Sequence, residues 1–569
     1  MAAPSVLAFL PLLLLAAFSA ASTSAHRIPN PFPPIIPLHL QALRQQQQQQ
    51  RVSSSDAKLV TAAAADAGTN STAQPFTTHY FPQELDHFTF TPNASMVFRQ
   101  KYLVNDTFWR RPSGGNGTAG AGPLFVYTGN EGDIEWFATN TGFMFDIAPK
   151  FGALLVFIEC LNAENMIQSK IFSFCFLKSR GPRCPEPGPR PPLALPLPLA
   201  RQARSAAGLR GLPTAGRAAV ALADFAILIT SLKQNLSAKT APVVVFGGSY
   251  GGMLASWFRL KYPHVAIGAL ASSAPILQFD YITPWSSFSD AISQDYKSES
   301  LNCFSVIKAT WDVLDERGAN DRGLLELSKL FRACKTLKYA DSIAGWLQTA
   351  FVYTAMVDYP TPANFLKNLP AYPVKEMCKI IDGFPANADI LEKVFAAASL
   401  YYNFTGDQTC NQIEYDDDSS SSLGLSGWGW QACTEMIMPM SDSNESMFPP
   451  DTFSYEDTSN TCFQLYGVRP RPHWITTEYG GYKIDKVLKR FGSNIIFSNG
   501  LRDPWSRGGV LKDISSSIVA LVTEKGAHHL DLRSATKDDP DWVIEQRRQE
   551  VEIIHGWIDQ YHQDMAQAS

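Results

Sequence analysis

A single serine, Ser249, stands between an apolar, β-branched run at 241–246 and a helix-like run at 253–262, with two glycines on either side of the Ser-Tyr pair. Glycines are needed at a sharp strand-to-helix turn, because side chains there would collide with the neighbouring strand and helix. Such a turn lifts a serine hydroxyl clear of the backbone and is known as a nucleophile elbow. The pattern therefore predicts a strand, a tight turn and a helix, with Ser249 as a candidate nucleophile.

Two further residues follow strand-like segments near the C-terminus. Asp503 comes shortly after the apolar run 494–498, and His528 comes after the apolar run 517–522. The chain order Ser, Asp, His, with each residue after a strand, is the order of an α/β-hydrolase and differs from the order in other serine-protease folds. We therefore predict an α/β fold with an α/β-hydrolase core.

The chemistry of acyl transfer accounts for these three residue types. A serine hydroxyl is a poor nucleophile at its own pKa, so His528 must take its proton, and Asp503 must hold the imidazole in the required tautomer. Structural alternatives exist for two of them. Asp503 could simply begin a turn before Pro504, and one of the adjacent pair His528 and His529 is usually structural. The combination favours catalysis.

An oxyanion hole needs two backbone donors beside the nucleophile. The N–H of Tyr250, the residue after the serine, is expected to be one of them. The second is expected from the turn that contains Gly129 and Asn130, directly after the strand-like run 124–127.

From Tyr80 to its end the chain resembles the S28 serine peptidases. Within that family it is most similar to the lysosomal Pro-Xaa carboxypeptidases, and the dipeptidyl peptidase II branch is their sister. The resemblance rests on these segments: 80–88, 127–132, 247–253, 272–276, 356–360, 431–435, 467–477, 503–509 and 526–533. It implies that Ser249, Asp503 and His528 form the triad.

The resemblance also implies roles for residues around the triad. His529 and Arg533 match an additional hydrogen-bonded relay, although a His and an Arg at this spacing could equally lie on a surface. Met253, Met438 and Trp505 match the pocket for proline, whose compact, apolar ring without an N–H suits walls of thioether and aromatic groups. Without the resemblance, all three would be interpreted as core residues.

A long insertion separates the two halves of the predicted core, 76–276 and 406–569. Residues 277–405 show helical periodicity at 303–316, 322–335 and 388–403, which predicts an inserted helical cap. The resemblance implies that this cap is of the SKS type found in the S28 family. The aspartates at 416–418 read as a solvated loop, and no metal or organic cofactor is implied.

Six cysteines of the C-terminal half form an even set, which suits disulfides in an oxidising compartment, although the residues alone leave the pairing open. By resemblance we expect Cys303 with Cys378, Cys334 with Cys410, and Cys433 with Cys462. A further bridge of the family would use positions that are Trp285 and Ser441 here, so it is absent from this chain.

The N-terminus predicts entry into the secretory route. Residues 1–25 read as a signal peptide too short to span a membrane, and 26–75 as a disordered, Gln-rich pro-segment. Seven glycosylation sequons agree with this route: Asn70, Asn93, Asn105, Asn116, Asn235, Asn403 and Asn444. The sequence does not choose between lysosome or vacuole and the extracellular space.

Residues 160–219 form an anomalous block. The stretch from 180 to 217 is rich in Pro and Arg and contains no Lys, Asn, Asp, Ile, Phe, Tyr or Trp. Residues encoded by A/T-rich codons are thus missing, which favours a GC-rich segment translated out of frame over a genuine Pro-rich insertion. Family resemblance resumes at 221–225. In the family, the segment that this block replaces is expected to pack beside the elbow strand and the rim of the active site.

The predicted triad, together with the resemblance to the S28 family, implies a serine exopeptidase that acts on peptide substrates with a penultimate proline and removes the residue after it. The net charge of −5 gives no electrostatic footprint for nucleic acid, and the oligomeric state is open, with a homodimer as one option. Three alternatives remain: release of N-terminal dipeptides, a luminal glycoprotein inactivated by the 160–219 block, and a lipase or esterase with the same elbow.

Overall fold

The computed structural model describes residues 76–85, 87–88, 97–112, 121–160, 217–413 and 423–568. Its centre is an eight-stranded sheet with the spatial order β1-β2-β4-β3-β5-β6-β9-β10. The strands are β1 (Thr77–Glu84), β2 (Val97–Asn105), β3 (Leu124–Thr128), β4 (Leu154–Ile158), β5 (Val243–Gly248), β6 (Gly268–Ser272), β9 (Ile495–Gly500) and β10 (Ile518–Thr523). Only β2 runs antiparallel to its neighbours β1 and β4, and the other pairs are parallel.

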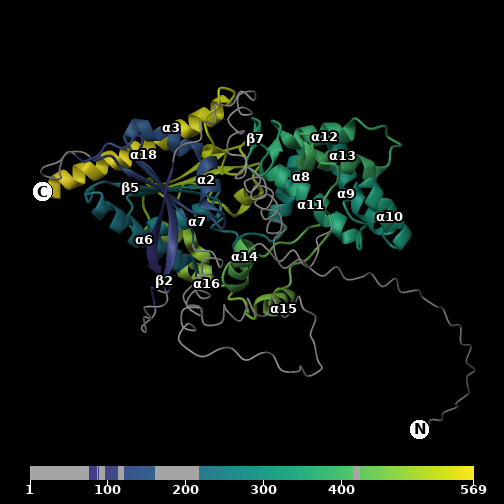
Figure 1. Ribbon diagram of the computed structural model, residues 1–569, viewed down its shortest axis with the longest axis horizontal. Helices are drawn as coiled ribbons and strands as arrows, with labels where there is room; N and C mark the ends of the chain where they lie inside the picture. The colour runs from purple at the N-terminus through teal and green to yellow at the C-terminus, as the bar shows by residue number, and fades with distance from the viewer. Residues whose placement is uncertain are drawn as a thin grey trace, which may run out of the picture.

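The central strands are apolar because helices cover both faces of the sheet, as parallel sheets require. Every residue of β3, β4, β5, β6 and β9 is buried. Figure 1 shows α3 and α18 on one face and α6 and α7 on the other. The helices of the core are α2 (Ile134–Asn140), α3 (Gly142–Phe151), α6 (Arg217–Asn235), α7 (Tyr250–Lys261) and α18 (Asp541–Ala568).

A helical cap is inserted between β6 and β9 and lies beside the sheet (Figure 1). It contains α8 (Ser287–Glu299), α9 (Leu301–Arg317), α10 (Asp321–Leu330), α11 (Ala340–Met356), α12 (Pro373–Asp382), α13 (Ile390–Asn403) and the small hairpin β7 (Ala363–Asn364) and β8 (Asn368–Leu369). The return to the sheet passes through α14 (Leu423–Thr434), α15 (Tyr455–Tyr466), α16 (Trp474–Tyr479), the 3-10 turn η1 (Gly481–Lys483) and α17 (Ile484–Phe491).

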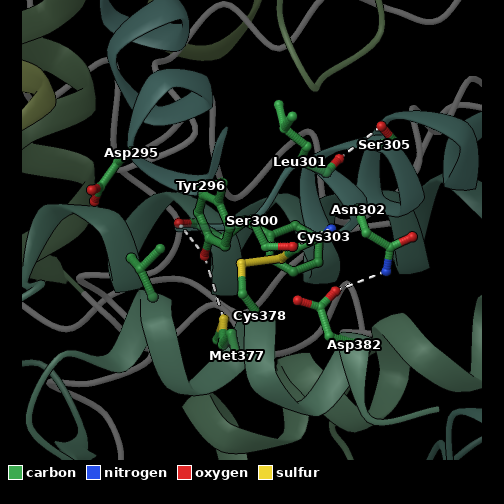
Figure 2. The surroundings of a disulfide bond; sticks show 12 residues. Asp295, Tyr296, Ser300, Leu301, Asn302, Cys303, Ser305, Met377, Cys378 and Asp382 are labelled. Carbon is green, nitrogen blue, oxygen red and sulfur yellow. Dashed lines mark hydrogen bonds between the residues drawn. A yellow bond between two sulfur atoms is a disulfide. The ribbon is translucent and has the colours of Figure 1, made fainter. Parts of the chain in front are cut away.

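Three disulfides connect the insertion internally, and their pairing confirms the expectation. Cys303–Cys378 joins α9 to α12 inside the cap, where Tyr296 of α8 packs beside it (Figure 2). The other bridges are Cys334–Cys410 and Cys433–Cys462. At the position of the missing family bridge, the N–H of Ser441 donates to the carbonyl of Trp285, 3.0 Å away. The two positions are thus neighbours without a covalent link.

Two predictions need correction. The helix expected over 322–335 is α10, which already ends at Leu330, because Arg332 has a left-handed φ of 47° and the N–H of Cys334 pairs with the carbonyl of Asn411. The sequon at Asn105 is unsuitable for a glycan in the folded protein, since the side chain is 1% exposed and its oxygen accepts from the N–H of Thr107.

The other described sequons differ in exposure. Asn235 and Asn444 are exposed, and Asn403 is half-buried. The signal peptide, the pro-segment, most of the 160–219 block, the aspartates at 416–418 and the sequons at Asn70, Asn93 and Asn116 lie outside the described residues. Within the described ranges, no helix is both long and apolar enough to cross a bilayer.

Candidate active site

The elbow is a strained turn between β5 and α7. Ser249 has φ 57° and ψ −125°, a backbone conformation that a non-glycine residue rarely adopts. The flanking glycines permit it: a Cβ on Gly247 would lie 2.1 Å from the carbonyl oxygen of Gly251, and one on Gly251 would lie 2.5 Å from that of Thr128. The N–H of Ser249 donates to the carbonyl of Ser272 at 2.9 Å, which anchors the turn to β6.

Asn130, expected at the oxyanion hole, braces this elbow with its side chain. Its Nδ2 donates to the carbonyl of Gly248 at 2.7 Å, and its Oδ1 accepts from the hydroxyl of Tyr127 at 2.8 Å. Gly129 does not fit the expected role, because its N–H already donates to the carbonyl of Ile158 at 2.9 Å as part of the sheet. The brace joins residues 118 positions apart, so the sequence carries no signal for it.

Asp503 and His528 form a buried pair. Asp503 begins the 3-10 turn η2 (Pro504–Gly508) directly after β9, and its Oδ1 accepts from the N–H of Trp505 at 3.0 Å. Its Oδ2 lies 2.8 Å from Nδ1 of His528. A carboxylate only accepts, so Nδ1 of His528 is the donor and Nε2 is left as the basic nitrogen. Both side chains are at most 2% exposed, which keeps water from competing for this bond.

The histidine loop packs against the elbow. A Cβ on Gly248 would lie 3.0 Å from the ring of His529, which is tighter than an ordinary van der Waals contact, so glycine favours the close approach of this ring. The N–H of His529 donates to Oγ of Ser273 at 2.7 Å, and its φ of 36° turns the chain there. The neighbours of Ser249 and His528 are therefore in direct contact, although 281 positions separate Gly248 from His529 in the chain.

His529 is fully buried among apolar and cationic groups. Its ring centroid lies 4.5 Å from that of His528 and 4.9 Å from that of Phe365, a residue of the cap. Burial, followed by the nearby His528 and Arg533, holds the pKa of His529 well below its usual range, so this side chain is neutral. The guanidinium of Arg533 donates to the backbone carbonyl and Oδ1 of Asn140, at 2.9 and 3.0 Å.

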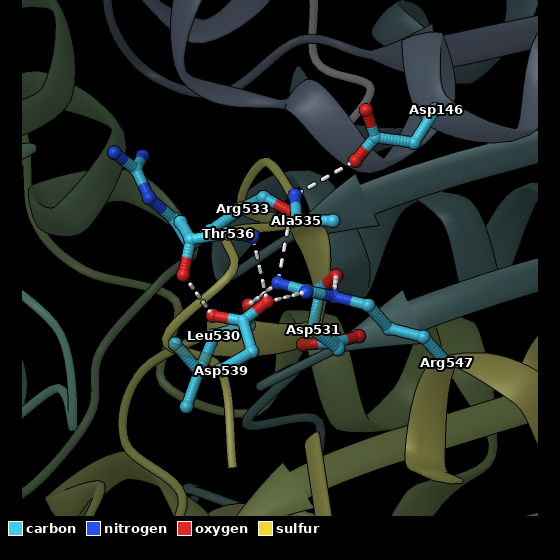
Figure 3. Close-up of polar contacts among 8 residues, drawn as sticks. All are labelled: Asp146, Leu530, Asp531, Arg533, Ala535, Thr536, Asp539 and Arg547. Atoms are coloured by element: carbon cyan, nitrogen blue, oxygen red, sulfur yellow. Dashed lines mark hydrogen bonds and ion pairs between the residues drawn. The ribbon is translucent and has the colours of Figure 1, made fainter. Parts of the chain in front are cut away.

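Arg547 of α18 holds the turn that follows the histidines. Its guanidinium donates to the carbonyls of Leu530, Asp531 and Arg533, at distances of 2.9 to 3.1 Å (Figure 3). It also forms an ion pair with Asp539. Because the three carbonyls belong to the 3-10 turn η3 (Leu530–Leu532) and the residue after it, the C-terminal helix fixes the backbone directly behind His528 and His529.

The three residues expected in the proline pocket are buried in one continuous apolar cluster, and each is at most 9% exposed. Met253 lies in the first turn of α7, four residues after Ser249, and Trp505 follows Asp503 closely. The ring of Trp505 packs edge-on against Phe288 of the cap, with 4.8 Å between centroids. Aromatic and thioether groups therefore border the elbow and the acid.

The strand order, the strained serine after β5, and the Asp–His pair after β9 and β10 define an α/β-hydrolase. A family model described as serine carboxypeptidase S28 matches residues 83–160 and 207–550. The chain belongs to this family. The internal gap between the two matched parts, 161–206, falls inside the block that is anomalous in the sequence.

Among its relatives, the chain is 40% identical to a mouse lysosomal Pro-X carboxypeptidase, over 85% of this chain and 90% of the relative. The human lysosomal Pro-X carboxypeptidase is 39% identical, over 87% of this chain and 92% of the relative. A human thymus-specific serine protease is more distant, at 25% identity over 84% of this chain and 86% of the relative.

Proposed function

We propose that this chain is a serine carboxypeptidase that removes the C-terminal residue after a proline. The observation that carries this proposal is the buried Asp503–His528 pair, packed against a strained elbow that presents Ser249. The family membership and the similarity to proteins named lysosomal Pro-X carboxypeptidase support the substrate class.

In the proposed reaction Ser249 Oγ attacks the carbonyl carbon of the proline residue while Nε2 of His528 takes the hydroxyl proton. The oxyanion is held by the N–H of Tyr250 and by a second donor. Because the N–H of Gly129 is engaged in the sheet, this second donor is proposed to come from the turn at Asn130. His528 then gives the proton to the leaving amine, and the C–N bond breaks to leave a prolyl ester on the serine. Water, deprotonated by His528, hydrolyses the ester and frees the proline-ended peptide.

The pocket residues Met253, Met438 and Trp505 are proposed to enclose the pyrrolidine ring. A proline residue has no backbone N–H, so an apolar pocket leaves no donor of the substrate without a partner. A polar substrate residue in the same pocket would lose its hydrogen bonds. The additional relay of His529 and Arg533, which the family resemblance implies, is also proposed here, since the ring of His529 lies beside that of His528 and the charge of Arg533 lies near His529.

The site of action is proposed to be the lumen of the secretory route, with the lysosome as the destination. Three disulfides and the exposed sequon residues Asn235 and Asn444 fit this compartment. The similarity to relatives named lysosomal supports the destination.

A peptide with a penultimate proline tests the function when it is supplied in three forms: free, N-terminally acetylated and C-terminally amidated. We expect loss of the last residue from the free and acetylated forms and no cleavage by the Ser249→Ala variant. Cleavage of a dipeptide from the free N-terminus, abolished by acetylation and retained in the amide, would replace this proposal with the dipeptidyl peptidase alternative. Sequencing the cDNA across 160–219 establishes which chain should be assayed.

A further inference from the structure

Both backbone polar groups of His528 are bound by the cap. Its N–H donates to the carbonyl of Met356 at 2.9 Å, and its carbonyl accepts from the hydroxyl of Tyr359 at 2.8 Å. Met356 is the last residue of α11, and Tyr359 follows three residues later. Both contacts come from the cap and not from the strands of the sheet, and they fix the position of the His528 backbone.

The same cap segment reaches the residue beside the acid. Asp358, which lies between Met356 and Tyr359 in the chain, forms an ion pair with Arg502, the neighbour of Asp503. Its other oxygen accepts from the N–H of Val374 in α12, at 3.1 Å. Asp358 therefore joins two helices of the cap to the loop after β9.

Arg502 also binds α8. Its guanidinium lies 3.0 Å from Glu299 and 3.7 Å from Asp295. Figure 2 shows the carboxylate of Asp295 directed away from the Cys303–Cys378 disulfide. The N–H of Arg502 donates to the carbonyl of Gly526 at 3.0 Å, two residues before His528. One residue thus connects the cap, the acid loop and the histidine loop.

We propose that the cap segment 356–359 is a positioning element for the proton relay, which aligns His528 and Asp503 through Tyr359 and the Asp358–Arg502 pair. This inference rests on the proposed function only in taking His528 as the base. The cap therefore helps to form the catalytic site and does not only cover it. Its contacts with the core set the position of the base, His528.

A catalytic side chain must be held within about 0.5 Å of its productive place, and a misplacement of about 1 Å can cost about a hundredfold in rate. Tyr359 is 2% exposed and its bond to His528 is buried, so removal of the hydroxyl takes a buried hydrogen-bond donor away from the carbonyl of His528.

The test compares Tyr359→Phe with Tyr402→Phe. Tyr402 is a matched control, since it is a buried cap tyrosine whose hydroxyl donates to a backbone carbonyl inside the cap, that of Trp346, at 2.9 Å. The measurements are the thermal unfolding temperature, the rate of Ser249 labelling by a fluorophosphonate, and kcat and KM on a Pro-Xaa peptide. Asp358→Asn, which keeps the volume and removes the charge, provides a second variant if Tyr359→Phe fails to fold.

We expect Tyr359→Phe and Asp358→Asn to lower the labelling rate and kcat by about tenfold or more, with KM within about threefold of wild type, and Tyr402→Phe to leave all three near wild type. Equal effects of the two Phe variants, or wild-type labelling by both Tyr359→Phe and Asp358→Asn, would overturn the inference. Labelling is independent of the peptide. A wild-type protein that is labelled but does not cleave Pro-Xaa peptides would refute the proposed function and leave this inference standing.

Discussion

Replacing Asp503 by Asn isolates the role of the carboxylate without changing its volume. The Trp505 N–H donates to Oδ1 of the aspartate, so an asparagine would keep its oxygen there and turn its NH2 group toward Nδ1 of His528. Two donors would then face each other unless the imidazole moves its proton to Nε2. That tautomer leaves no basic nitrogen for Ser249, so the base would be present in the wrong form.

The loss expected from a wrong tautomer is about ten-thousandfold in kcat, or about 5 kcal/mol of transition-state stabilisation. The surface pair His555 and Asp559 supplies a control, because its Nδ1–Oδ2 distance of 2.9 Å is nearly the same while both side chains are more than half exposed. The assay is kcat on a Pro-Xaa peptide, with the unfolding temperature measured for both variants. Asp559→Asn should retain full activity. A fall of less than about tenfold for a folded Asp503→Asn enzyme would refute the assignment of Asp503 as the partner of the base.

Three further outcomes are expected. Cys334→Ser opens a bridge with a sequence separation of 76 residues and should lower the free energy of unfolding by about 4 kcal/mol, measured by urea titration; an unchanged midpoint would contradict the bridge. Gly251→Ala places a Cβ 2.5 Å from the carbonyl of Thr128 and should abolish fluorophosphonate labelling, whereas Gly345→Ala, with nothing within 4 Å, should not. Burial raises the pKa of Asp358 from 3.8 to about 6, so the folded state binds more protons between these values and stability is lost as the pH rises through that window. The unfolding temperature of wild type should fall more steeply from pH 4 to 7 than that of Asp358→Asn, and parallel curves would show that this carboxyl does not titrate there.

The sequence predicted the central strands because parallel strands covered on both faces are uninterrupted apolar runs, as in β3, β5 and β9. It did not predict β1 as a strand, since β1 lies at the sheet edge and is largely exposed, so it carries no apolar signature. Its place is set by the register with β2, which pairs Thr77 with Val104. The glycines around Ser249 predicted the elbow, and the chain order Ser, Asp, His predicted which residues form the site.

The supports of the site could not be predicted, because they are contacts between distant segments. Asn130 reads as an oxyanion residue in its local context, and only the fold brings its amide to Gly248. Arg502 reads as an ordinary loop residue, yet its partners Asp358 and Glu299 lie 144 and 203 positions earlier in the chain. Such pairs produce no periodicity or motif in the sequence. They can be identified only in the folded structure, where the cap contacts the core.

Trapping the acyl-enzyme shows whether Ser249 is the nucleophile. A Pro-Xaa peptide is mixed with the enzyme, the reaction is quenched in acid within the first turnover, and the protein is digested and analysed by mass spectrometry. We expect the peptide containing Ser249 to gain the mass of the proline-ended acyl group, and this gain to be absent in Ser249→Ala. Turnover of the substrate with no adduct on Ser249, or with an adduct on another residue, would contradict it.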